Sequence, residues 1–144
     1  MALKSCKDLR VWQKGLELVV ETYRVSAHLP TEEKYGLRSQ MQRAAVSIVA
    51  NIAEGYGRSH RGDYLHHLSI AMGSLQELDT HVEIVRRLGL LYEGDLHTLH
   101  TLQMLGDEVG RLLTRLIQSL SSRPQPLAPR PQPLASPPPP SQTP

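Results

Sequence analysis

Apolar residues recur at spacings of three and four along four long segments of the chain, the period of an amphipathic helix. The first predicted helix runs from Leu9 to Ala27, with Asp8 as its N-cap and Pro30 closing the segment. The second runs from Tyr35 to Glu54 and is predicted to end at Gly55, where glycine can adopt a left-handed conformation. The predicted core faces are Leu9, Trp12, Leu16, Val19, Val20 and Tyr23 in the first helix, and Leu37, Met41, Ala44, Ala45, Ile48 and Ile52 in the second.

The third predicted helix starts near Asp63, a good N-cap, and Gly89 ends it. It carries two adjacent apolar seams, which are wide enough to pack against two neighbours. The fourth runs from Glu93 to Leu120 and includes Gly106 and Gly110, which favour close helix contact. The two seams of the third helix are Leu65, Leu68, Met72, Leu75 and Val82, interrupted by Asp79, and Tyr64, Ala71, Leu78 and Val85.

The segments between these helices are short, and short loops make consecutive helices antiparallel neighbours. No stretch shows the alternation of β-branched and aromatic residues with polar ones that is typical of strands. The sequence therefore predicts an all-α fold, an antiparallel up-down-up-down four-helix bundle over residues 1–120.

Residues 121–144 differ sharply in composition, because they contain all but one of the 11 prolines. The hexapeptide RPQPLA occurs at Arg123 and again at Arg130. Such a segment is predicted to be a disordered, extended and polyproline-like tail. One interpretation is a peptide for aromatic-lined grooves; the alternative is an incidental or solubilising tail.

Charge is balanced within the predicted bundle, because the net charge of +2 comes from Arg123 and Arg130 in the tail. The high isoelectric point therefore does not indicate a basic nucleic-acid-binding domain. Cys6 is the single cysteine, which excludes an intrachain disulfide and fits a reducing compartment. No apolar run reaches the ~18 residues that a membrane span needs. We expect a soluble, cytoplasmic protein with no membrane partner.

The second helix combines small apolar residues with a line of polar ones. Arg43, Ser47, Asn51 and Glu54 recur at spacings of four, four and three. Alanines elsewhere on the helix would let a further helix approach closely. We expect this polar line to be paired inside the bundle or across an interface between copies, where buried polar groups can fix register. The alternative is an ordinary solvent-facing stripe.

Three segments carry a resemblance to a known family, and they occur in order: DLRVWQKGLELVVETYRVSAHLP (8–30), YGLRSQMQRAAVSIVANIAEGYGR (35–58) and YLHHLSIAMGSLQELDTHVEIVRRLGLL (64–91). They resemble bacterial four-helix bundle proteins encoded in intervening sequences of 23S ribosomal RNA genes, which are often labelled ribosomal-protein-like. The resemblance covers residues 8 to 120.

The resemblance implies a homo-oligomeric ring, a pentamer, with no established enzymatic activity. A more remote similarity is to the accessory protein of diversity-generating retroelements, a pentameric bundle that binds nucleic acid and a reverse transcriptase. That protein is strongly basic. The neutral charge of this bundle departs from it and weakens the transfer of nucleic-acid binding.

Catalytic and metal-binding patterns are missing from the sequence. No Glu has a His three residues later, as inward-facing di-iron sites in bundles require. We therefore expect no enzyme, no cofactor, no metal site and no small-molecule substrate. The best binding candidate is the loop after the second helix, where Arg58, His60 and Arg61 precede a helix N-terminus that could receive phosphate. The alternative there is a solvated loop in which Arg58 pairs with Glu54.

Two functions follow from these patterns. The first is a non-enzymatic oligomeric bundle that acts as a binding or scaffolding module for RNA or a ribonucleoprotein. The second is an oligomeric interaction protein that displays several proline-rich tails to peptide-binding partners.

Overall fold

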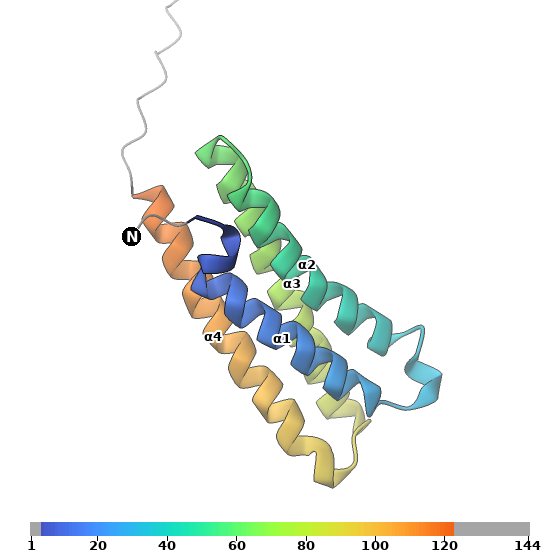
Figure 1. Cartoon of the computed structure of the whole chain (residues 1–144). Helices are drawn as coiled ribbons and strands as arrows, with labels where there is room; N and C mark the ends of the chain where they lie inside the picture. Colours follow the sequence, from blue (N-terminus) through green and yellow to red (C-terminus); the bar gives the residue numbers. More distant parts are fainter. Residues whose placement is uncertain (1–3, 123–144) are drawn as a thin grey trace, which may run out of the picture.

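The computed structural model describes residues 4–122, and these residues form four long helices and three short 3-10 turns without a strand (Figure 1). The predicted all-α class is confirmed. The helices are α1 (Arg10–Ala27), α2 (Leu37–Tyr56), α3 (Arg61–Leu88) and α4 (Leu96–Ser121), and the turns are η1 (Cys6–Asp8), η2 (Thr31–Glu33) and η3 (Glu93–Asp95). The predicted proline-rich tail lies, beyond Ser122, outside the described residues.

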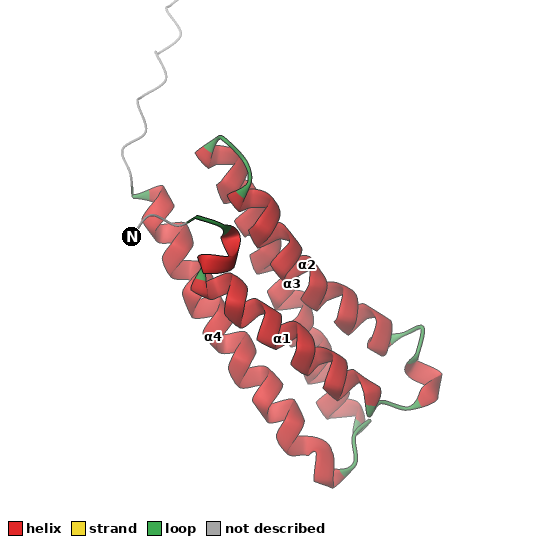
Figure 2. Ribbon diagram, viewed as in Figure 1, coloured by secondary structure: helices red, strands yellow, loops and turns green. Residues whose placement is uncertain are grey.

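Each helix packs against the helices before and after it, and α4 returns to α1 (Figure 2). The chain therefore runs up, down, up and down around one core. The contact between α2 and α3 is the most extensive of the four. The core consists of aliphatic side chains from all four helices. Its largest fully buried members include Leu18, Met41, Ile48, Ile52, Leu68, Leu99, Leu102 and Leu113.

The helix starts differ from the prediction. Asp8 does not cap α1: it belongs to η1, and its carboxylate accepts the backbone N–H groups of Lys4 and Ser5 at 3.0 and 3.1 Å. Leu9 is the residue before α1 and makes no side-chain cap. α2 begins at Leu37, whose N–H donates to Oε2 of Glu33 at 3.1 Å. The Glu33 carboxylate, one turn earlier, therefore satisfies an N–H group at the start of α2, whereas the Asp8 carboxylate accepts from N–H groups that precede η1.

The prediction that the second helix ends at Gly55 is wrong. It is buried inside α2, and a Cβ built on it would lie 2.8 Å from Cβ of His67 on α3. Glycine is needed here for close helix contact rather than for a left-handed turn. α2 continues to Tyr56, and α3 begins at Arg61 with His60 as the preceding residue, so Asp63 is in the first turn rather than the N-cap.

The end of α3 agrees with the prediction. Gly89 adopts φ of 61° and ψ of 39°, the left-handed region, and its N–H donates to the carbonyl of Arg86 at 3.2 Å. The N–H of Leu90 donates to the carbonyl of Val85 at 3.2 Å, which closes the helix. The fourth helix begins at Leu96, three residues after the predicted start, because Glu93–Asp95 form η3.

Candidate functional site

The predicted polar line of α2 lies beside α3, and two of its members, Ser47 and Asn51, form a hydrogen-bonded network with α3. The Ser47 and Ser74 hydroxyl oxygens are 2.8 Å apart. Nδ2 of Asn51 donates to the carbonyl oxygen of Ser47 at 2.8 Å and to its hydroxyl at 3.2 Å. Oδ1 of Asn51 lies 3.1 Å from Nδ1 of His67. Side chains from two helices thus satisfy one another within a single chain.

Glu54 extends this network to the end of the bundle. Its Oε1 accepts a hydrogen bond from Nη2 of Arg58 at 2.8 Å and lies 3.9 Å from Nε2 of His67. Arg58 therefore has the partner that the alternative interpretation of this loop gave it. Arg43, the first member of the line, is exposed and lines a shallow hollow with Ser47, outside the network.

The α2–α3 turn carries the predicted phosphate-binding residues at its surface. Arg58 and His60 are exposed and Arg61 is half-buried. His60 has extended backbone angles and provides no side-chain cap to α3. The first N–H groups of α3 thus have no side-chain cap from this residue, and a helix N-terminus with free N–H groups attracts anions. The turn places the three residues within four consecutive positions of the chain, 58–61.

Two tyrosines pack against each other where α2 meets α3, next to this turn. Tyr56 and Tyr64 meet edge to face, with ring centroids 6.2 Å apart and planes at 69°. Burial of Tyr64 raises the pKa of its phenol to about 12, and Tyr56 and Cys6 add to the shift. Tyr64 therefore stays neutral far above physiological pH, and its role at neutral pH is packing.

The apolar face predicted for the first helix forms the core only in part: Leu9 is buried, and Trp12 and Val19 pack against the core. Leu16, Val20 and Tyr23, which we call the α1 stripe, are 37%, 51% and 47% exposed. The buried residues of α1 are instead Val11, Gly15, Leu18, Thr22, Val25 and Ser26. Hydrophobic periodicity does not reveal this face, because three of its six members are polar or glycine.

The polar members of the buried face are satisfied locally. The Thr22 hydroxyl donates to the carbonyl of Leu18 at 2.7 Å, and the Ser26 hydroxyl donates to that of Tyr23 at 3.1 Å. Nε2 of Gln42 on α2 donates to the Ser26 hydroxyl at 3.0 Å. Buried hydroxyls with partners add little cost, so α1 can turn its larger apolar residues outward.

The α1 stripe continues onto α2. Val46 is 42% exposed, and it lines, together with Tyr23, a shallow hollow of about 510 Å³. Ala50, one turn after Val46, is exposed as well. The α1 stripe, Val46 and Ala50 form one surface across both helices, which we call the α1–α2 face. Contiguous exposed apolar surface of this kind marks interaction sites.

Residues 4–122 contain no group of three or more His, Cys, Asp and Glu side chains that could hold a metal ion. None of the helices in this part of the chain is long and apolar enough to cross a membrane.

Comparisons with known proteins agree with this architecture. Residues 7–115 match the sequence profile described as 23S rRNA-intervening sequence protein. A crystal structure from Bacteroides thetaiotaomicron, of a protein with unknown function from the S23 ribosomal protein family, is similar to this chain with a TM-score of 0.67 and 26% sequence identity. The match covers 75% of this chain and 95% of that one. No curated protein matches the chain.

Proposed function

The chain belongs to the 23S rRNA-intervening sequence protein family, and we propose that it acts as a non-enzymatic, homo-oligomeric helical bundle, a scaffold that binds RNA or a ribonucleoprotein. We infer the oligomer from the exposed apolar residues of the α1–α2 face. In a single copy Leu16, Val20 and Tyr23 are exposed to solvent. Polar residues are the usual choice at exposed positions of a helix. A second copy of the chain would remove this surface from water.

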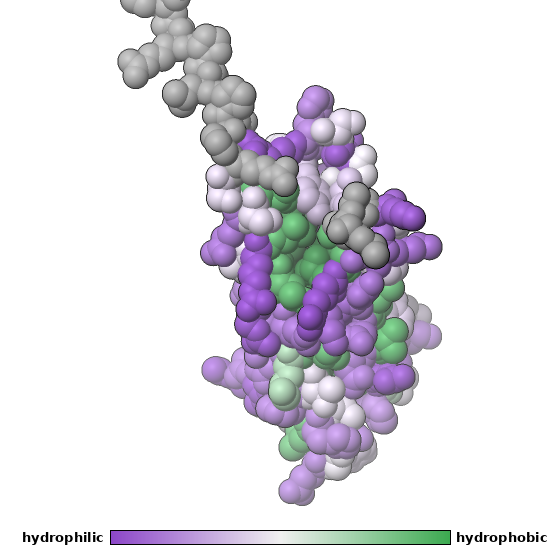
Figure 3. Space-filling view, turned by 60° about the vertical axis from the view of Figure 1, so that its left-hand side comes forward, coloured by the Kyte–Doolittle hydropathy of each residue, from purple (hydrophilic) through white to green (hydrophobic). Residues whose placement is uncertain are grey.

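A closed ring needs two different surfaces on each copy, because each contact is head to tail. A second apolar region lies on α4, where Leu112 and Leu116 are only partly buried against the core. Leu105 of the same helix lines one hollow with Leu16 and Val20 of the α1 stripe. Figure 3 shows the side of the molecule on which α4 comes forward, with hydrophobic side chains gathered in its upper half between hydrophilic ones. The α1–α2 face of one copy against this region of the next is the arrangement that supports a ring.

A scaffold also fits the way the polar side chains are used. Ser47, Asn51 and His67 hydrogen-bond with one another and join α2 to α3. A general acid or base must instead reach a proton on a bound substrate. These groups hold the two helices in register, which is a structural task.

The proposed RNA contact is at the α2–α3 turn, where Arg58, His60 and Arg61 surround the start of α3. A single turn offers weak attraction, since Glu54 already pairs with Arg58. A ring would repeat the turn once per copy, and linked weak contacts gain strength from their high effective concentration. The name of the matching family, with its link to 23S rRNA genes, supports RNA over other polyanions.

Interface variants test the oligomer. Val20→Glu places a charge in the α1–α2 face, so we expect it to reduce the particle mass measured by light scattering. Ile84→Glu is the matched control, because Ile84 is a partly exposed apolar residue on α3, at 37% exposure. A Val20→Glu protein with the mass of the wild type would contradict the assignment of this face.

A gel-shift titration with structured RNA tests the ligand. Phosphate contacts release counterions, so binding should weaken steeply as salt rises. We expect the double variant Arg58→Ala, Arg61→Ala to bind more weakly with a shallower salt dependence. The control is Arg115→Ala, which removes an exposed arginine from α4. Absence of salt-sensitive binding at micromolar protein would leave the bundle as a scaffold for another class of ligand.

A further inference from the structure

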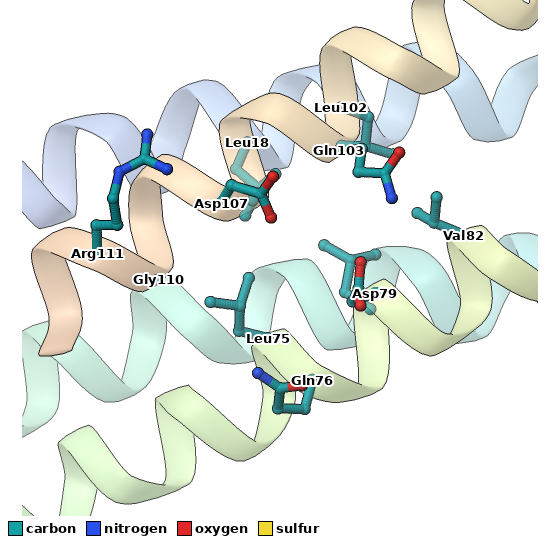
Figure 4. Close-up of a pocket in the computed structure, with 12 residues that line it drawn as sticks. Leu18, Leu75, Gln76, Asp79, Val82, Leu102, Gln103, Asp107, Gly110 and Arg111 are labelled. Carbon is teal, nitrogen blue, oxygen red and sulfur yellow. The ribbon is translucent and has the colours of Figure 1, made fainter.

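A groove of about 290 Å³ lies between α3 and α4, away from the α2–α3 turn and the α1–α2 face (Figure 4). Its floor is apolar and deeply buried: Leu75, Leu78, Val82 and Leu102 are at most 5% exposed. Gly106 and Gly110 form part of the α4 wall, so this wall has no side chains at two positions one turn apart. The α3–α4 groove therefore offers apolar surface to a narrow, extended occupant.

Two carboxylates stand at the groove. Asp79 on α3 and Asp107 on α4 both line it, both are exposed, and neither forms an ion pair with another residue of 4–122. Arg111, one turn after Asp107, also lines the groove (Figure 4), but it forms no ion pair with Asp79 or Asp107. The groove thus combines an apolar floor with unpaired negative charge, which suits a segment that carries both apolar residues and a cation.

The C-terminal segment of the same chain has this chemistry. Residues 123–144 contain two arginines, ten prolines and no acidic residue. In each copy of RPQPLA the arginine is followed by prolines and a leucine. Proline has no backbone N–H, so such a segment can lie on an apolar surface with fewer unsatisfied donors.

Length also fits. The described chain ends at Ser122, just after α4, and Asp107 lies 15 residues earlier, roughly 22 Å along the helix axis at 1.5 Å per residue. Arg130 is eight residues beyond Ser122. An extended proline-rich segment spans about 25 Å over that number of residues, at 3.1 Å each. A tail that folds back along α4 would therefore bring Arg130 level with Asp107.

We propose that residues 123–135 dock in the α3–α4 groove of their own chain. In this arrangement Arg130 pairs with Asp79 and Asp107, and the prolines and Leu127 lie against the apolar floor. This contact does not depend on self-association or on RNA. It would keep the proline-rich segment out of reach of peptide-binding partners until they compete for it. Because exposed ion pairs are weak and screened by salt, the docked fraction should fall as salt rises.

The test places a nitroxide spin label on the full-length chain at Gln132→Cys, in a Cys6→Ser background. The methyl signals of Leu78, Val82 and Leu102 report on the groove, and those of Val46 and Val49 on the far side of the bundle. We expect strong relaxation enhancement at the groove methyls and little at the others. Arg130→Gln should reduce the docked fraction by about two- to fivefold, the effect of losing an exposed ion pair of up to ~1 kcal/mol.

Two further samples make the result decisive. The double variant Asp79→Asn, Asp107→Asn changes exposed residues and should reproduce the loss seen with Arg130→Gln. In a second sample, chains that carry methyl labels but no spin label are mixed with spin-labelled chains that carry no methyl labels. The enhancement at the groove should then be much weaker, because a label docked in a neighbouring copy lies farther away. Equal enhancement on all sides of the bundle, indifference to both charge variants, or undiminished enhancement in the mixed sample would each overturn docking within one chain.

Discussion

Gly15 of α1 lies directly against Val49 of α2: a Cβ at position 15 would stand 2.6 Å from Cγ1 of Val49. The valine side chain occupies the space that any other residue would fill, so α1 meets α2 with its glycine side. This contact fixes how α1 is rotated about its axis. With Gly15, Leu18 and Thr22 turned inward, the α1 stripe of Leu16, Val20 and Tyr23 has to face outward.

Gly15→Ala should destabilise the protein despite the higher helix propensity of alanine. The added methyl group forces Val49 or α1 to move, and overpacking of this kind costs about 1–3 kcal/mol. Urea unfolding at one fixed protein concentration measures the change. Gly73→Ala is the control, because no atom lies within 4 Å of a Cβ built there. That variant should gain up to about 1 kcal/mol, and a similar gain at position 15 would show that the two helices are not in close contact.

Gly55→Ala tests whether this residue is inside α2 or at its end. A Cβ there would lie 2.8 Å from Cβ of His67 and 3.1 Å from a ring carbon of Tyr64. We expect a loss of about 1–3 kcal/mol in the free energy of unfolding. Gly57→Ala, where a Cβ would meet atoms no closer than 3.6 Å, should change stability little. The reverse order of the two effects would place the end of the helix at Gly55.

Asn51→Leu should weaken the fold and leave the particle mass unchanged. The Asn51 side-chain amide forms hydrogen bonds with Ser47 and His67 of the same chain. Leucine cannot form them, so the half-buried imidazole of His67 would lose its amide partner. Removing one partner of such a pair costs roughly 1–3 kcal/mol. Urea unfolding and light scattering on the same sample separate stability from assembly. A change in mass with unchanged stability would instead assign Asn51 to the contact between copies.

Stability should fall in alkaline solution through Tyr64. Its pKa in the folded protein is about 12, mainly because of burial, whereas an unfolded tyrosine ionises near ~10. The fold therefore favours the neutral phenol: the contribution is complete below pH ~10 and is lost as the pH rises towards 12. Because Tyr64 is only half-buried, we expect no more than about 2 kcal/mol. Unfolding by urea at several alkaline pH values measures the loss.

Tyr64→Phe provides the comparison, since phenylalanine keeps the ring and cannot ionise. Its stability should decline less over this pH range than that of the wild type. Parallel declines in the two proteins would mean that other groups cause the alkaline loss.

The sequence predicts the helices well and the helix faces less well. Long amphipathic segments separated by short loops identify four helices, and Gly89 marks the end of α3 because its turn needs a left-handed residue. Periodicity assigns the core face by the size of apolar side chains. It therefore chooses Leu16, Val20 and Tyr23 in α1, whereas the structure buries Gly15, Thr22 and Ser26. Only the position of α2 shows why small residues are needed there.

The candidate sites divide in the same way. The spacing of Ser47, Asn51 and Glu54 places them on one line, and the structure adds their partners Ser74, His67 and Arg58. Those partners lie on another helix or in a turn, where spacing along α2 gives no information. The α3–α4 groove had no signal of its own, because it depends on two carboxylates and two glycines that meet only after the helices pack.

Light scattering of the purified wild-type chain across a dilution series tests the central claim, that the α1–α2 face is covered by another copy. We expect particles several times heavier than the 16.1 kDa chain, and about 80 kDa for a ring of five. Particles of one chain that stay folded at every concentration would contradict it.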